Sequence, residues 1–128
     1  MNTAFQLVFL KGNWKLDRLI DQKKDLVIWG CNDCNHPERI CTDLSGSARF
    51  TESFADIQYT VITESSTSDT SKISYRGSYI LNRWGFWIFI KNEVTGKVDT
   101  LSISKTYPEG GLTLSKDYVE TYWEKCEN

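Results

Sequence analysis

Apolar and polar side chains alternate along most of this chain, and the alternation predicts strands. A period of two is typical of a half-buried strand, whereas an amphipathic helix repeats every three to four residues. The segment "KISYRGSYIL", residues 72–81, alternates in this way. In "NWKLDRLI", residues 13–20, the same rhythm predicts one face made of Trp14, Leu16, Arg18 and Ile20.

Further runs of this kind occupy 25–29, 44–50, 56–63, 86–93, 98–107, 111–115 and 118–126. Polar turns such as "DQKK" and "VTGK" separate them, and the polar tract 63–72 is interpreted as a loop or the tip of a long hairpin. Short strands spaced by about 8 to 12 residues are typical of sandwiches and barrels. Because a meander removes its edges most economically by closing, we expect an all-β, antiparallel up-and-down barrel of about eight strands. Residues 1–128 would form this single domain, with a short helix over 4–10 as the one helical option.

Two segments of the predicted strands depart from the simple alternation, one through small residues and one through apolar residues on both faces. Gly46 and Ala48 in "LSGSARF" predict a place where the sheet bends or another backbone approaches. The segment "NRWGFWIFIKN" is apolar on both faces, so one face should line the barrel and the other, with Trp87 and Phe89, needs a cover. That cover would be the N-terminal segment or a partner.

Composition and charge narrow the class of function. The 128 residues include five Trp, six Tyr and six Phe, and the formal net charge is only -2. Acidic and basic side chains are interspersed, so nucleic acid is not an expected partner. The apolar run from Phe5 to Leu10 is too short to span a bilayer and lacks the charged start of a leader peptide. The sequence does not determine the cellular compartment, and an exported protein is slightly favoured if a leader peptide has been removed.

The stretch "KGNWKL" carries a family resemblance. Gly12 and Trp14 match the glycine-any-tryptophan signature at the first strand of the lipocalin-like, or calycin, barrels, and the tail resembles the closing strands of short bacterial members. The resemblance implies that Trp14 packs across the closed end of the barrel beneath a basic side chain of the last strand. Lys125 stands where the family usually has arginine.

The stretch "GCNDCNHPERIC", residues 30–41, holds three of the four cysteines and the only histidine. Zinc would use Cys31, Cys34, His36 and Cys41, but paired zinc ligands are usually separated by a dozen residues or more. A nucleophilic cysteine activated by His36 would also need an orienting group and an oxyanion pocket, and neither is readable. In an oxidising compartment, disulfides among Cys31, Cys34, Cys41 and Cys126 are the third interpretation. The family resemblance implies one long-range bridge to Cys126.

The function expected from these patterns is non-enzymatic binding of a small apolar or amphipathic molecule inside the barrel, without cofactor or metal. On the predicted phase the wall contains Trp14, Phe50, Ile57, Tyr59, Tyr79, Leu81, Phe86 and Ile88. The residues expected to bind the ligand are Phe50, Tyr59, Tyr79, Phe86 and Ile88. The alternative is a protein-interaction or inhibitor module with a solid core, which contacts its partner through loops 30–41 and 63–72.

Overall fold

The computed structural model describes residues 10–30, 44–63, 69–82, 87–106 and 111–126. All of its regular elements are strands, as the alternating pattern predicts. Their bounds are β1 Gly12–Asp21, β2 Leu26–Trp29, β3 Leu44–Phe50, β4 Phe54–Thr63, β5 Asp69–Leu81, β6 Trp87–Asn92, β7 Val98–Thr106, β8 Gly111–Lys116 and β9 Val119–Cys126. The helix considered for 4–10 falls, apart from Leu10, outside the described residues.

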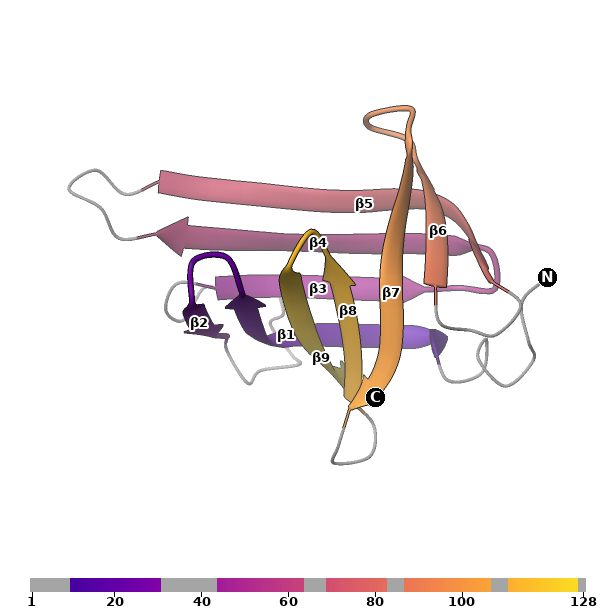
Figure 1. The fold of residues 1–128 in the computed structure, drawn as a ribbon. Helices are drawn as coiled ribbons and strands as arrows, with labels where there is room; N and C mark the ends of the chain where they lie inside the picture. Colours follow the sequence, from indigo (N-terminus) through magenta and orange to yellow (C-terminus); the bar gives the residue numbers. More distant parts are fainter. Residues whose placement is uncertain (1–9, 31–43, 64–68, 83–86, 107–110, 127–128) are drawn as a thin grey trace.

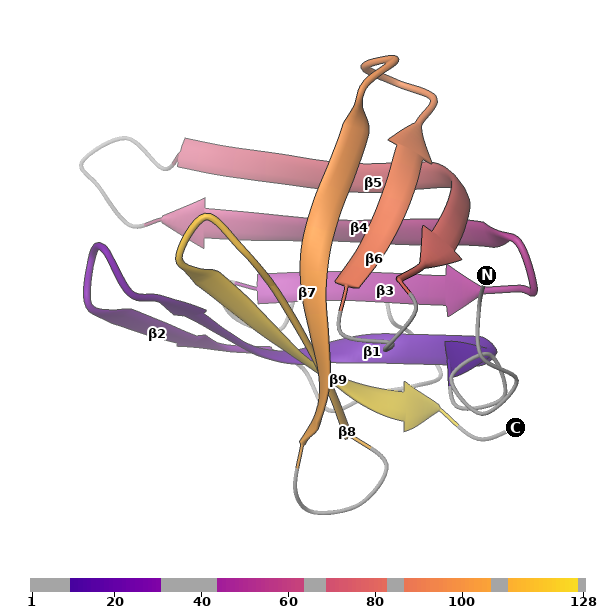
Figure 2. The ribbon, with the colours of Figure 1, turned by 45° about the vertical axis from the view of Figure 1, so that its right-hand side comes forward.

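The nine strands form one antiparallel sheet in the order β2-β1-β3-β4-β5-β6-β7-β8-β9, and β1 also pairs with β9 (Figure 1). The closing pair runs from Asn13 opposite Cys126 to Asp21 opposite Val119. Eight strands therefore close on themselves, and β2 is an extra strand beside β1. This confirms the predicted antiparallel barrel. Figure 2 shows β3, β4 and β5 on one side of it and β7 crossing on the other.

The inward face of β1 differs from the predicted one. The pairing with β9 shifts between Leu16 and Arg18, so one extra residue is accommodated as a β-bulge. Beyond the bulge the buried side chain is Leu19, and Arg18 instead lies outside, 4.2 Å from the centre of the Tyr122 ring. The prediction that Arg18 and Ile20 share the face of Trp14 is therefore wrong, because a single bulge reverses the phase of a strand.

The same strand changes its second neighbour half-way along. β1 pairs with β3 as far as Lys15 opposite Ser47, and from Arg18 opposite Trp29 onward it pairs with β2. Gly30 continues this contact, since its N–H donates to the Asp17 carbonyl at 2.8 Å. The strand next to β1 in the barrel wall therefore differs between the two ends: it is β3 at one end and β2 at the other.

Two glycines permit close approaches within the wall. A Cβ atom at Gly46 would lie 2.7 Å from Cβ of Tyr59, and one at Gly77 would lie 1.8 Å from the Lys91 carbonyl oxygen. Any larger side chain would push the neighbouring strand away, so both positions require glycine. The expectation of a close approach at Gly46 is confirmed.

One end of the barrel is packed solid around Trp14. Its indole N–H donates to the Leu10 carbonyl at 2.9 Å, and Nζ of Lys125 lies 5.3 Å from the centre of its ring. Gly12 has φ +125, and a Cβ there would come within 3.2 Å of Cε of Lys125, so the glycine makes room for the lysine stem. The expected contact between Trp14 and a basic side chain of the last strand is confirmed.

The predicted interior face is largely confirmed. The side chains of Trp14, Phe50, Ile57, Tyr59, Tyr79, Leu81 and Ile88 are all buried in one apolar cluster. Phe86 lies outside the described residues. On β6 the alternation also holds, because Ile88 and Ile90 are fully buried whereas 46% of Trp87 is exposed. The polar tract is the end of a long hairpin, with Thr63 opposite Asp69, and its tip, 64–68, is outside the described residues.

Candidate functional site

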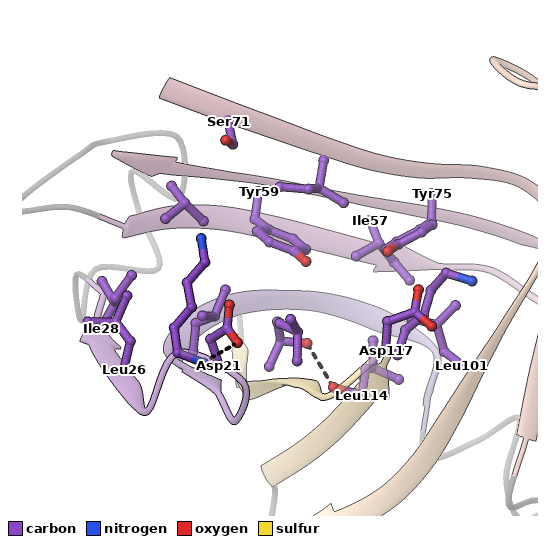
Figure 3. A pocket seen from close by; sticks show the side chains of 17 residues that line it. Asp21, Leu26, Ile28, Ile57, Tyr59, Ser71, Tyr75, Leu101, Leu114 and Asp117 are labelled. Atoms are coloured by element: carbon purple, nitrogen blue, oxygen red, sulfur yellow. Dashed lines mark hydrogen bonds between the residues drawn. The ribbon is translucent and has the colours of Figure 1, made fainter. Parts of the chain in front are cut away.

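The end of the barrel opposite Trp14 contains a cavity of about 290 Å³. It lies where β1, β2, β4, β5 and the β8–β9 hairpin come together, and Figure 3 shows side chains from both sides of the barrel pointing into it. Ligand sites in proteins typically begin at about 300 Å³, so the cavity suits a small molecule. Its apolar lining consists of Leu19, Leu26, Ile28, Ile57, Val61, Ile73, Leu101, Leu114 and Val119.

Two tyrosines provide the polar centre of this apolar space. Figure 3 shows Tyr59 of β4 and Tyr75 of β5 with their hydroxyl groups directed toward one another. Below Tyr59 the ring of Trp123 packs edge to face, with 6.4 Å between ring centres. Thr121 also lines the cavity, but its hydroxyl already donates to the Leu114 carbonyl and accepts from the Trp123 indole. The tyrosine hydroxyls, and that of Ser71 on β5, are therefore the uncharged polar groups of the lining that a ligand could use.

Burial keeps both phenols neutral. It raises the pKa of Tyr59 well above its ordinary value, and the neighbouring Tyr75, through charge and a hydrogen bond, adds to the rise. Burial likewise raises the pKa of Tyr75; the Asp99 and Asp117 carboxylates add to it, and the bond with Tyr59 opposes it. Both hydroxyls therefore keep their protons and can donate a hydrogen bond, to each other or to a ligand.

Charged groups occur at the mouth of the cavity rather than along its wall. Two carboxylates, Asp21 and Asp117, and two amines, Lys24 and Lys116, line the rim. The Asp21 carboxylate accepts the backbone N–H groups of Lys23 and Lys24 at 3.1 and 3.2 Å, which fixes the β1–β2 turn. Nζ of Lys116 lies 3.7 Å from a carboxylate oxygen of Asp99. The rim therefore carries no net charge, and the pocket favours a neutral occupant.

The structure separates the residues expected to bind the ligand. Of the four that the structure describes, Tyr59 alone lines the cavity. Phe50 and Tyr79 instead pack on each other at the solid end, with ring centres 5.8 Å apart, and the Tyr79 hydroxyl donates to the Thr51 carbonyl at 2.6 Å. Ile88 is fully buried away from the cavity, and Phe86 lies outside the described residues.

Tyr75 and Ile73 are the main cavity residues that sequence reasoning did not select. They share the inward face of β5 with Tyr79 and Leu81, so their orientation was readable from the alternation. The alternation of apolar and polar residues does not indicate which end of β5 borders a cavity. Leu26 and Ile28 were also missed, because β2 joins the wall only through its pairing with the far half of β1.

The cysteine-rich stretch 31–41, with the zinc alternative Cys31, Cys34, His36 and Cys41, lies outside the described residues. Within the part that the structure describes, no cluster of three or more His, Cys, Asp or Glu side chains is placed to hold a metal ion. Cys126 is the one cysteine in that part, and it is not a free thiol. Its pairing with Cys31, Cys34 or Cys41 stays a prediction.

Comparison of the chain with models of protein families, with curated proteins and with solved structures found no match. Among the described residues, no helix has the length and apolar character needed to cross a membrane.

Proposed function

We propose that this protein binds one small, neutral, amphipathic molecule in the open end of a lipocalin-like barrel, without catalysing a reaction on it. The observation that carries the proposal is the cavity of about 290 Å³, which nine aliphatic side chains line together with the hydroxyl groups of Tyr59 and Tyr75. Removing apolar surface from water would supply most of the affinity, at roughly 25 cal/mol per Å² of buried area. The description of the barrel as lipocalin-like is supported by the contact of Trp14 with Lys125 and by the room that Gly12 leaves for this contact.

The tyrosine pair defines the polar end of the ligand. A hydroxyl or carbonyl oxygen placed between the two rings can accept an O–H from Tyr59 or Tyr75, whose hydroxyls both point into this space. A carboxylate is a poorer fit, because Asp99 and Asp117 raise the pKa of Tyr75 and would repel a second anion there. Transferring an unpaired charged group from water into the apolar interior also costs free energy, on the order of several kcal/mol. The ligand class is therefore a short-chain or single-ring alcohol, phenol or ketone.

A neutral fluorescent naphthylamine probe tests the cavity. Titration should quench tryptophan fluorescence and saturate at one probe per chain, since Trp123 lies next to Tyr59. The blocking variant is Val61→Phe, because Val61 lines the cavity, and the control is Val98→Phe, because Val98 is 62% exposed. We expect Val61→Phe to weaken binding by about tenfold or more, the equivalent of about 1.4 kcal/mol, and Val98→Phe to leave it unchanged. Equal binding by both variants would place the probe elsewhere.

Competition by molecules of equal chain length tests the polar end. Octanol should displace the bound probe at lower concentration than octanoate does, because an unpaired carboxylate loses more hydration free energy than a hydroxyl on entering the apolar part of the cavity. Tyr75→Phe should remove much of this preference while the probe itself still binds. A preference for octanoate would contradict the assignment of a neutral ligand.

The alternative, a protein-interaction or inhibitor module acting through loops 30–41 and 63–72, rests on segments that fall mostly outside the described residues. Absence of saturable probe binding to the folded chain would favour it. In either case we propose a disulfide between Cys126 and one cysteine of residues 31–41, supported by the bonded state of Cys126. Peptide mapping without reduction identifies the partner, and an alkylated Cys126 would refute the bridge.

A further inference from the structure

A second concave surface lies on the outside of the barrel, over β6, β7, β8 and the β8–β9 turn. This outer groove, of about 550 Å³, is lined by Gln22, Trp87, Thr100, Ser102, Ser115, Lys116, Asp117, Tyr118 and Glu120. The strands concerned lie in front of β3, β4 and β5 in Figure 1. The groove is distinct from the cavity, although Lys116 and Asp117 reach both.

The floor of the outer groove is a row of polar side chains set by strand register. Trp87 stands opposite Ser102, Ser102 opposite Ser115, and Ser115 opposite Glu120. The hydroxyls of Ser102 and Ser115 are hydrogen-bonded to each other. The Glu120 carboxylate accepts from the Gln22 amide and, at 3.2 Å, from the Tyr122 hydroxyl. These contacts hold a planar carboxylate, a planar amide and two hydroxyls in fixed positions before any ligand arrives.

Two aromatic side chains flank this floor and remain in contact with solvent. Trp87 is 46% exposed and Tyr118 is 63% exposed. Tyr118 has φ +69 in a two-residue turn whose other member, Asp117, has φ +52. Asn and Gly are the residues usually found in such turns, and a tyrosine with positive φ is an outlier that costs free energy. The sequence therefore places a large ring where the backbone favours a small residue, and that ring lines the groove.

The charges around the groove do not favour an anionic occupant. Asp117 and Glu120 contribute two carboxylates, whereas Nζ of Lys116 is 3.7 Å from Asp99 and Nζ of Lys23 lies 5.2 Å from the centre of the Tyr118 ring. An apolar peptide also fits poorly, because the floor between the two rings is made of hydroxyls, an amide and a carboxylate that would lose water without new partners. A sugar matches both features: its C–H face stacks on an aromatic ring, and its equatorial hydroxyls both donate and accept at the edge.

We propose that the outer groove is a binding site for a neutral oligosaccharide. One sugar ring stacks on Trp87, and its hydroxyls reach the Ser102–Ser115 pair and the Glu120 carboxylate. Tyr118 closes the opposite side. This proposal does not rest on ligand binding in the cavity.

Nuclear magnetic resonance titration of the ¹⁵N-labelled full chain tests the proposal with three probes: maltotriose, cellotriose and tri-N-acetylchitotriose. We expect at least one to shift the Trp87 indole N–H and the amides of Ser102 and Ser115, with saturation in the millimolar range. Trp87→Ala should weaken this binding by about tenfold or more, and Trp87→Tyr should retain part of it because a ring remains. Trp29→Ala is the control, since Trp29 is 59% exposed on β2, outside the groove.

Three results would overturn the proposal. The first is the absence of shifts at these residues with all three trisaccharides. The second is an equal loss of binding in the Trp29→Ala and Trp87→Ala variants. The third is a groove response to an apolar peptide such as tri-leucine but to none of the sugars, which would indicate a protein partner instead. Val61→Phe, which blocks the cavity, should leave the sugar response unchanged, so the two sites are tested separately.

Discussion

The two ends of this barrel are built from the same strands and the same inward face, yet one is solid and the other is hollow. On β5, Tyr79 and Leu81 are buried at the solid end, and Ile73 and Tyr75, on the same face, line the cavity. The difference shows that alternation determines which side chains face inward, whereas their position along the strand determines whether they meet other side chains or an empty space.

Large side chains fill the solid end of the barrel. Trp14 is buried at that end, and Phe50 and Tyr79 pack edge to face beside it. At the hollow end β1 has exchanged β3 for β2 after its bulge. The wall there consists largely of aliphatic side chains, and the rings of Tyr59 and Tyr75 border the cavity without filling it.

The largest expected effect comes from making the same truncation at each end. Ile88→Ala at the solid end should lower the free energy of unfolding by about 2 to 5 kcal/mol, because it leaves a void that its neighbours cannot fill. Ile73→Ala should cost less, about 1 kcal/mol, because Ile73 already borders a cavity. Urea unfolding measures both values. Equal losses would mean that the hollow end is as tightly packed as the solid end.

Enlarging the same two side chains, instead of truncating them, also compares the two ends. Ile88→Phe should destabilise the protein by about 1 to 3 kcal/mol through overpacking, whereas Ile73→Phe should be nearly neutral because the cavity accepts the ring. The same Ile73→Phe variant should weaken binding of the neutral probe. Thermal unfolding with and without probe gives both readouts. If Ile73→Phe proved stable and still bound the probe normally, the cavity would not be the probe site.

A smaller effect is expected from the cation over Trp14. Lys125→Met keeps the length of the side chain and removes its charge, and it should lower stability by about 0.5 to 2 kcal/mol. Lys125→Arg should retain most of the stability, because the guanidinium also lies favourably over an indole ring. Urea midpoints at low and high salt compare the two. Unchanged stability in Lys125→Met would indicate that the lysine acts through packing of its stem alone.

The smallest effect is a pH dependence confined to alkaline solution. Burial and then Glu52 raise the pKa of Tyr79 from 10.0 to about 12. Because the folded pKa is above the unfolded one, this contribution is fully present below pH 10 and is lost as the pH rises through about 12. Tyr79→Phe should therefore reduce the loss of stability between pH 9 and pH 11, measured by urea unfolding. An unchanged pH slope would show that Tyr79 ionises as easily in the folded chain as in the unfolded one.

Two features limited what sequence reasoning could find at the site. The bulge after Leu16 turned Leu19 inward, and nothing in the local alternation of residues 13–20 marks an inserted residue. The mutual approach of Tyr59 and Tyr75 depends on the register of β4 against β5 and on the curvature of the sheet. Of the five residues expected to bind a ligand, Tyr59 lines the cavity, Phe50, Tyr79 and Ile88 are buried in the core away from it, and Phe86 lies outside the described residues.

The sequence by itself determined the all-β class, most strand positions and the inward faces of β3 to β6. These follow from local periodicity and from residue types, which a chain carries whatever its surroundings. The contact of Trp14 with Lys125 was implied by the family resemblance instead. The tertiary structure alone decided that one end is open, that β2 replaces β3 beside β1, and which tyrosines face the cavity. Such features depend on how many side chains from distant strands meet at one point, and that number is fixed only when the sheet closes.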